Sequence, residues 1–152
     1  MSIKKLIQPE YFQGAKKKNK YFEGWYYKLV SSDEKTTLAF IPGISKNLTD
    51  PHVFIQVFIS EKHGEHVSLK TAYFRFNHQD FSYGTDVFFI KIKDNYFSKH
   101  QLVINLENET MAIHGTIKLK DLHPIKRTLF MPNIMGFFGY FNFMECYHGV
   151  IS

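Results

Sequence analysis

The sequence is poor in cysteine, and it contains no long apolar run. Cys146 is its only cysteine, so an intrachain disulfide is excluded, as is typical of proteins from a reducing compartment. No stretch approaches the roughly 20 consecutive apolar residues that a membrane-spanning helix needs. The first residues, Met1 to Lys5, form no apolar signal core. We therefore expect a cytoplasmic protein.

The signatures of the common catalytic classes are also missing. The chain has no phosphate-binding glycine loop, no dinucleotide fingerprint, no nucleophile elbow and no zinc-finger cysteine pair. Outside a lysine run near the N-terminus it has no basic stripe and no recognisable nucleic-acid module, so we expect no nucleic-acid partner. Glu145, Cys146 and His148 come closest to a metal site, but neighbours on a strand point to opposite faces. We predict neither a metal nor a cofactor, and for Cys146 we favour a buried thiol beside a hydrogen-bonded His148.

Aromatic residues, in contrast, are abundant. They make up 17% of the chain, with sixteen Phe and nine Tyr. Aromatic side chains suit the packed, pleated surface of a sheet. Two interpretations are open: a bulky core, or a cavity lined for a greasy or ring-bearing ligand.

Short apolar runs bounded by turn residues recur from Tyr21 onward, and they predict an antiparallel all-β fold, either a sandwich or a barrel. The predicted strands cover residues 21–30, 36–44, 52–60, 67–76, 86–93, 101–107 and 112–120. We interpret residues 1–20 as a flexible basic lead-in and residues 21–152 as one β domain. The strand 53–59 is apolar on both faces except at Gln56, so we expect it to be covered on both sides.

Charge is concentrated near the N-terminus. The formal net charge is +5, and Lys16, Lys17, Lys18 and Lys20 form one run. Such a run is typical of a solvated face or a flexible arm. It also suits peripheral contact with an anionic membrane surface.

Two carboxylates lie inside aromatic runs. Glu23 precedes Gly24 and Trp25, and Glu145 follows Met144. A carboxyl group that faces an apolar cavity has a raised pKa and can act as a general acid, whereas a surface or paired carboxylate has no such role. Trp25, the only tryptophan, is either a core residue or an aromatic wall that stacks on a ring or shields a cation.

Other polar groups are spaced to share a face. His52 and Gln56 lie on the same side of a strand, either as buried structural groups or as a pair that orients a ligand. Near the C-terminus, aromatic residues crowd into 137–147 and the chain ends at Ser152. An apolar closing strand needs a neighbour, so we expect self-association or a missing C-terminal half.

Four strings together resemble the tocopherol cyclase-like family. They are Tyr21-Phe22-Glu23-Gly24-Trp25-Tyr26-Tyr27-Lys28, Phe40-Ile41-Pro42-Gly43-Ile44-Ser45, His52-Val53-Phe54-Ile55-Gln56-Val57 and Met144-Glu145-Cys146-Tyr147-His148-Gly149. The resemblance runs from Tyr21 to the C-terminus and covers about the N-terminal half of the family's usual length. It implies a lipocalin-like architecture with two β halves, of which this chain is one, as an open barrel or a sandwich.

The resemblance also implies an activity, the acid-catalysed ring closure of a prenylated hydroquinone or related isoprenoid lipid. Such chemistry needs a neutral acid, a dry pocket and aromatic faces near the cation. Within the family's strings, the candidate acid is Glu23 or Glu145, with His148 as a third catalytic candidate. The candidate substrate-binding residues are Trp25, Tyr26, His52, Gln56 and Tyr147. Two alternatives stay open: a non-catalytic lipocalin-like binding module for an apolar ligand, and a fragment that needs a partner half.

Overall fold

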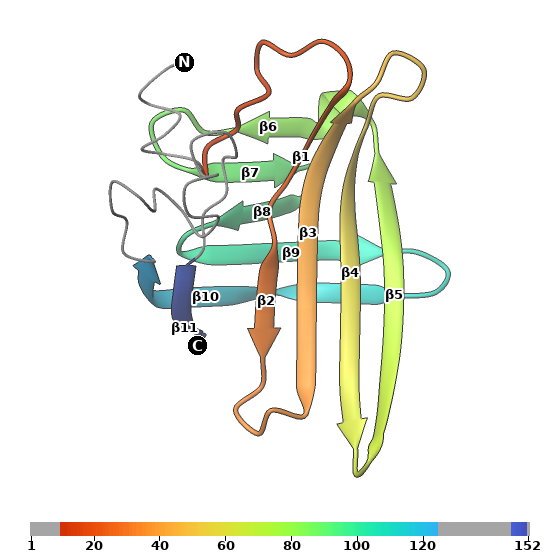
Figure 1. Ribbon diagram of the computed structural model, residues 1–152, viewed down its shortest axis with the longest axis vertical. Helices are drawn as coiled ribbons and strands as arrows, with labels where there is room; N and C mark the ends of the chain where they lie inside the picture. The colour runs from red at the N-terminus through yellow and green to blue at the C-terminus, as the bar shows by residue number, and fades with distance from the viewer. Residues whose placement is uncertain (1–9, 125–146, 152) are drawn as a thin grey trace, which may run out of the picture.

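A computed structural model of the chain describes residues 10–124 and 147–151. These residues form two antiparallel sheets and no α-helix. The sheets lie face to face, and the strands of one run across those of the other without closing into a barrel (Figure 1). This confirms the predicted antiparallel all-β fold and identifies it as a sandwich.

The first sheet has five strands, of which the three longest follow one another in the sequence. It contains β1 (Tyr21–Gly24), β2 (Tyr27–Val30), β3 (Thr36–Lys46), β4 (His52–His63) and β5 (His66–Phe76). β1 and β2 both pair with β3, followed by β4 and β5 in chain order. This sheet carries most of the predicted functional residues.

The second sheet has six strands in the order β11-β10-β9-β8-β7-β6. A short 3-10 turn, η1 (His78–Asp80), leads into β6 (Phe81–Tyr83), β7 (Phe89–Ile92), β8 (Asn95–Ser98), β9 (Gln101–Glu107), β10 (Ala112–Pro124) and β11 (Tyr147–Ile151). The predicted acid Glu145, Cys146 and the aromatic run 137–143 lie outside the described residues.

The strand prediction is largely confirmed. The predicted strand 101–107 matches β9, and 36–44, 52–60, 67–76 and 112–120 match the cores of β3, β4, β5 and β10. The predicted strand 21–30 is divided at Trp25 and Tyr26 into β1 and β2. Two short strands, β6 and β8, lie between the predicted strands, in segments where turn residues surround them on both sides.

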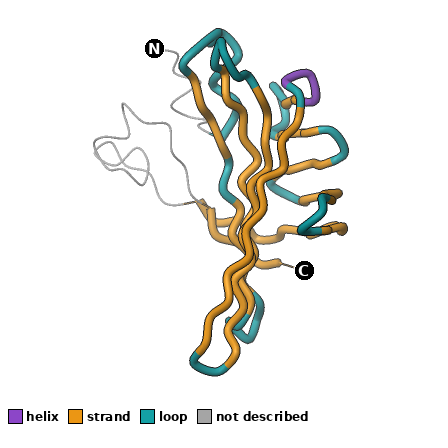
Figure 2. Tube along the Cα trace, turned by 90° about the vertical axis from the view of Figure 1, so that its right-hand side faces the viewer, coloured by secondary structure: helices purple, strands orange, loops and turns teal. Residues whose placement is uncertain are grey.

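The core lies between the two sheets. Val53, Ile55 and Val57 point inward from β4 and are fully buried. They pack in one cluster with side chains of the second sheet, among them Phe97 and Leu102. Figure 2 shows the five-stranded sheet edge-on, with the second sheet against one of its faces. The opposite face of β1–β5 is called the outer face below.

The segment that precedes β1 differs from the expected flexible lead-in. Phe12 packs on Trp25, Phe81 and Tyr83, with ring centroids 6.3, 5.1 and 4.6 Å away. Gly14 is buried, and a Cβ there would lie 2.2 Å from the Tyr21 ring. Residues 10–14 therefore belong to the packed domain, whereas the lysines that follow are exposed.

None of the described residues belongs to a helix long and apolar enough to cross a membrane.

Candidate functional site

Three aromatic rings form a row across the outer face of the first sheet. Phe22 of β1 stacks on Phe54 of β4, with centroids 5.6 Å apart and planes inclined by 15°. Phe54 stacks in turn on Tyr73 of β5, at 5.2 Å and 15°. Phe54 is buried in the middle, whereas Phe22 and Tyr73 are 67% and 48% exposed. The row therefore offers ring surface to whatever contacts this face.

A glycine sets the depth of the row. Gly43 of β3 lies directly opposite Phe54 in the register. A Cβ at position 43 would be 2.3 Å from the Phe54 Cζ atom, so only glycine lets the ring lie flat on the strand. Phe54 thus occupies space over the neighbouring strand and reaches toward Phe22.

A polar network borders the row at Tyr73. The His52 Nε2 atom lies 2.9 Å from the Tyr73 hydroxyl, and its Nδ1 atom lies 3.0 Å from the Asp50 carbonyl oxygen. Because a carbonyl only accepts, Nδ1 donates there, and a neutral imidazole then accepts the Tyr73 O–H at Nε2. Burial raises the pKa of Tyr73, which keeps its phenol protonated as the donor.

An ion pair supports the imidazole. Arg75 binds both carboxylate oxygens of Asp50 and holds the pKa of that carboxyl below its usual range. The Asp50 Oδ2 atom lies 3.4 Å from the His52 Nδ1 atom. The Asp50 backbone carbonyl, the His52 imidazole and the Tyr73 phenol therefore form a hydrogen-bonded chain at the edge of the aromatic row, with the Asp50 carboxylate beside it.

Further apolar side chains are exposed on the outer face. Tyr26 is 63% exposed, and the alternation along β1, β2 and β5 puts Val30, Val67 and Leu69 on the same side, all exposed. We call the row and these side chains the outer aromatic face. It is the largest gathering of exposed apolar side chains that the described residues present.

A second cluster lies on the inner side of the same sheet, around Glu23. Its carboxylate accepts hydrogen bonds from the backbone N–H groups of Gln13, at 3.0 Å, and Gly14, at 3.2 Å, and from the Tyr21 hydroxyl at 2.6 Å. Burial raises the pKa of Tyr21 well above its ordinary value, and the Glu23 carboxylate adds to the shift. In this arrangement Glu23 anchors the segment that precedes β1.

Trp25 completes the inner cluster. Its indole N–H donates to the Glu10 carbonyl oxygen at 2.7 Å, and its ring stacks on Phe81 with centroids 6.3 Å apart. Phe12 covers another part of the indole. Trp25 is partly buried, and protein side chains occupy the space beside it.

The structure divides the predicted site residues between surfaces. Tyr26, His52 and Gln56 lie on the outer side of the first sheet, whereas Glu23 and Trp25 lie on its inner side. Tyr147 and His148 belong to β11, at the edge of the second sheet, where they pair with Pro124 and His123. Glu145 lies outside the described residues.

Sequence reasoning missed Phe22, Tyr73 and Asp50 as site residues. Tyr73 shares its side of β5 with Leu69 and Arg75, so strand alternation alone marks it as outward-facing. The register that brings it beside His52 is set by the two-residue turn of the β4–β5 hairpin, and the predicted strands 52–60 and 67–76 ended before that turn.

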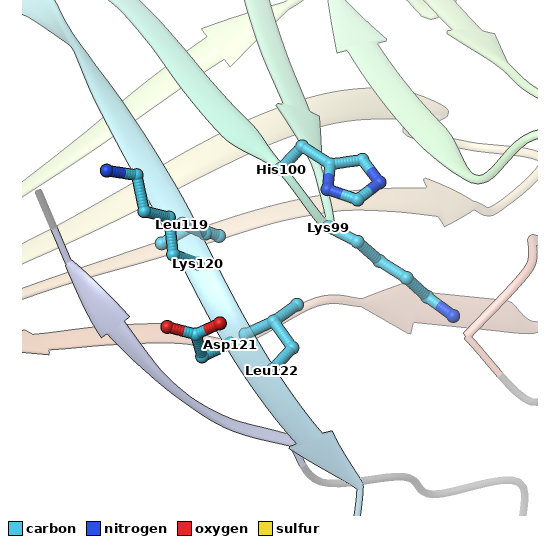
Figure 3. A pocket seen from close by; sticks show the side chains of 6 residues that line it. All are labelled: Lys99, His100, Leu119, Lys120, Asp121 and Leu122. Atoms are coloured by element: carbon cyan, nitrogen blue, oxygen red, sulfur yellow. The ribbon is translucent and has the colours of Figure 1, made fainter.

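A hollow of about 490 Å³ lies apart from these residues (Figure 3). It is lined by Lys99, His100, Leu119, Lys120, Asp121 and Leu122, from the β8–β9 turn and β10. None of the predicted site residues lines it, and its walls are part polar and part apolar. Over residues 10–124 and 147–151, no group of three or more His, Cys, Asp or Glu side chains is placed to hold a metal ion.

Comparison of the chain with protein-family models, with curated proteins and with solved structures gave no match in any of the three. The resemblance to the tocopherol cyclase-like family therefore stays a prediction from the four sequence strings.

Proposed function

We propose that this protein is a binding module for an apolar, ring-bearing lipid, such as an isoprenoid quinol, which lies on the outer aromatic face. The observation that carries the proposal is the row Phe22–Phe54–Tyr73, whose two end rings are exposed. Exposed aromatic surface of this kind is typical of an interaction site. Parallel rings at this spacing accept another flat ring by offset stacking.

The polar network gives the site an orientation. A quinol hydroxyl near Tyr73 can donate to the Tyr73 oxygen, whose own O–H is donated to His52. The isoprenoid chain then has the apolar side chains of the same face to lie on, among them Val67 and Leu69. We place this binding in the cytoplasm, in keeping with the single cysteine.

Equilibrium binding of a prenylated hydroquinone tests the proposal. Phe22→Ser and Tyr73→Ser should each weaken binding about 2- to 10-fold, the range expected for losing one stacked ring. Val87→Ser is the matched control, because Val87 is similarly exposed but belongs to the loop before β7. Mass spectrometry of lipid that co-purifies with the native protein would identify the natural ligand.

The fluorescence emission of Trp25 tests on which side of the first sheet the ligand binds. It lies on the inner side, so binding on the outer face should leave its emission unchanged. A ligand-induced emission shift, together with unaltered binding by Phe22→Ser and Tyr73→Ser, would contradict the outer site. A concentration-dependent dimer that loses ligand binding would assign the face to a second copy of the chain instead.

The second candidate function is ring closure of the same kind of ligand at Glu23. The observation in its favour is that Glu23 and Tyr21 form a carboxyl–phenol pair beside the rings of Phe12 and Trp25. In the reaction, a proton adds to the prenyl double bond, the phenol oxygen bonds to the resulting tertiary cation, and the phenol proton is released to a base.

For that reaction Glu23 has to be protonated and the substrate has to reach the inner cluster, so residues 10–14, whose N–H groups donate to the Glu23 carboxylate, have to leave. Chromanol formation from a prenylated hydroquinone, followed by chromatography, tests it. Glu23→Gln should abolish product, whereas Tyr73→Phe on the outer face should leave it unchanged. Full turnover by Glu23→Gln would exclude Glu23 as the acid.

A further inference from the structure

One end of the first sheet combines two loops that lie side by side at the top of Figure 1. The basic loop, residues 15–20, precedes β1, and the Leu48 loop, residues 47–51, joins β3 to β4. The backbone N–H of Leu48 donates to the Asn19 side chain at 3.1 Å, which ties the loops together. Residues far apart in the sequence therefore form one surface.

The basic loop is held in shape from below. The Lys46 ammonium group donates to the carbonyl oxygens of Gly14, at 2.8 Å, and Lys17, at 3.1 Å, and lies 5.2 Å from the centroid of the Phe12 ring. The Lys46 ammonium group therefore binds the backbone of the basic loop and is not counted among the solvent-facing charges. The lysines of the basic loop itself, Lys16, Lys17, Lys18 and Lys20, have exposed side chains.

The charge of this end is positive on balance. The loop residues 15–20 and 47–51 contain one carboxylate, Asp50, which is neutralised by Arg75. Glu23 accepts hydrogen bonds behind the loop from Gln13 and Gly14. The exposed lysines therefore face solvent without an acidic neighbour in either loop.

Apolar side chains project from the same end. Leu48, near the tip of its loop, is 76% exposed, more than any other large apolar side chain that the structure describes. Phe22 follows the basic loop by two positions and is also exposed. Exposed apolar tips surrounded by lysines are the combination that membrane-surface proteins use, because the tips enter the interface while the cations attract anionic lipid.

We propose that this end docks on an anionic membrane surface, with Lys16, Lys17, Lys18 and Lys20 against the headgroups and Leu48 and Phe22 in the interface. The inference goes beyond ligand binding and does not depend on it, since phospholipid alone tests it. Docking would place the Phe22 end of the outer aromatic face next to the bilayer, where an apolar lipid is available.

Sedimentation of the full chain with vesicles tests the proposal. Vesicles of phosphatidylcholine and phosphatidylserine (about 2:1) should bind the protein at least about tenfold more strongly than phosphatidylcholine alone, and salt should weaken the binding. Changing the four loop lysines to Gln should lower the partition coefficient about a hundredfold or more, since each lysine contributes roughly fivefold. Leu48→Ser should lower it several-fold.

A matched variant separates the effect of the loop lysines from the effect of the net charge of the protein. Changing Lys62, Lys70, Lys91 and Lys118 to Gln removes the same charge from exposed positions elsewhere, and it should leave binding within about threefold of the parent. Leu48→Trp should gain a blue-shifted emission component only with phosphatidylserine vesicles. Equal losses in both lysine variants, or no binding to these vesicles at low salt, would overturn the proposal. Tight binding to an oligonucleotide without binding to vesicles would overturn it in favour of nucleic acid.

Discussion

The ring of Phe54 lies flat on Gly43, its partner on the neighbouring strand, and fills the space that a side chain at position 43 would occupy. The ring is also enclosed between Phe22 and Tyr73, which leaves it little room to swing away. Aromatic cover of a strand glycine both fixes the register and removes apolar area from water.

We expect Gly43→Ala to destabilise the protein by about 1–2 kcal/mol, because the added methyl group overlaps the Phe54 ring. Urea unfolding measures the change. Combining it with Phe54→Leu should recover part of the loss, since the smaller side chain makes room, and the two effects should not add. Additive losses would show that the ring and the glycine are independent.

The all-β fold could be predicted from the sequence because the apolar runs are local signals. Alternation along Gln101–Glu107, for example, predicts β9, whose residues 102, 104 and 106 are buried. The short strands β6 and β8 gave no such signal. Asn95 begins β8 although asparagine is rare in strands, because its buried side chain is bonded on both sides.

The candidate site was predictable only in part. His52 and Gln56 share a face, as period two requires. Glu23 and Trp25, which adjoin Tyr26 in one string, point to the opposite side of the sheet from it. The contact of His52 with Tyr73 joins residues 21 positions apart, so it depends on the register of the β4–β5 hairpin, which the turn at Gly64 and Glu65 sets.

The packed segment before β1 predicts a large effect of one aromatic residue. Phe12→Ala should cost about 2–3 kcal/mol of unfolding free energy, because it removes a ring from between Trp25, Phe81 and Tyr83. Thermal denaturation measures it. Lys18→Ala, in the exposed loop that follows, should change stability by less than about 0.5 kcal/mol. Equal melting temperatures for the two variants would refute the packing role of Phe12.

Alkaline pH should destabilise the fold through Tyr27. Burial holds the pKa of Tyr27 well above the value of about 10 that a phenol has in the unfolded chain. The folded state therefore keeps a proton that the unfolded state releases, so stability is full below pH 10 and falls as the pH rises further. The loss is about 1.4 kcal/mol per pH unit.

Tyr27→Phe should move the alkaline unfolding midpoint upward, as followed by circular dichroism, because no proton then has to be retained. Tyr21, whose pKa is raised as well by burial and by the Glu23 carboxylate, should add to the alkaline loss. Tyr26→Phe is the control, since Tyr26 is exposed. An unchanged midpoint in Tyr27→Phe would locate the alkaline transition in other groups.

Asn95 should be the costliest polar side chain to remove from the second sheet. It is fully buried, donates to the Ile92 carbonyl oxygen at 3.2 Å and accepts from the Asn105 N–H at 2.8 Å. Asn95→Ala removes both hydrogen bonds from a buried position and should cost about 2–3 kcal/mol. Asn47→Ala, at an exposed turn, should stay within about 0.5 kcal/mol, and a similar value for Asn95→Ala would mean that water replaces its bonds.

The hairpin between β4 and β5 is a suitable point for attaching the protein to a surface. Its two-residue turn has Gly64 at a φ of 63°, and in Figure 1 the hairpin extends beyond the second sheet, at the end opposite the basic loop. Exposed turns of this kind tolerate insertions. A biotin acceptor sequence inserted between Gly64 and Glu65 would tether the protein to a sensor chip with the basic loop and Leu48 facing the flow.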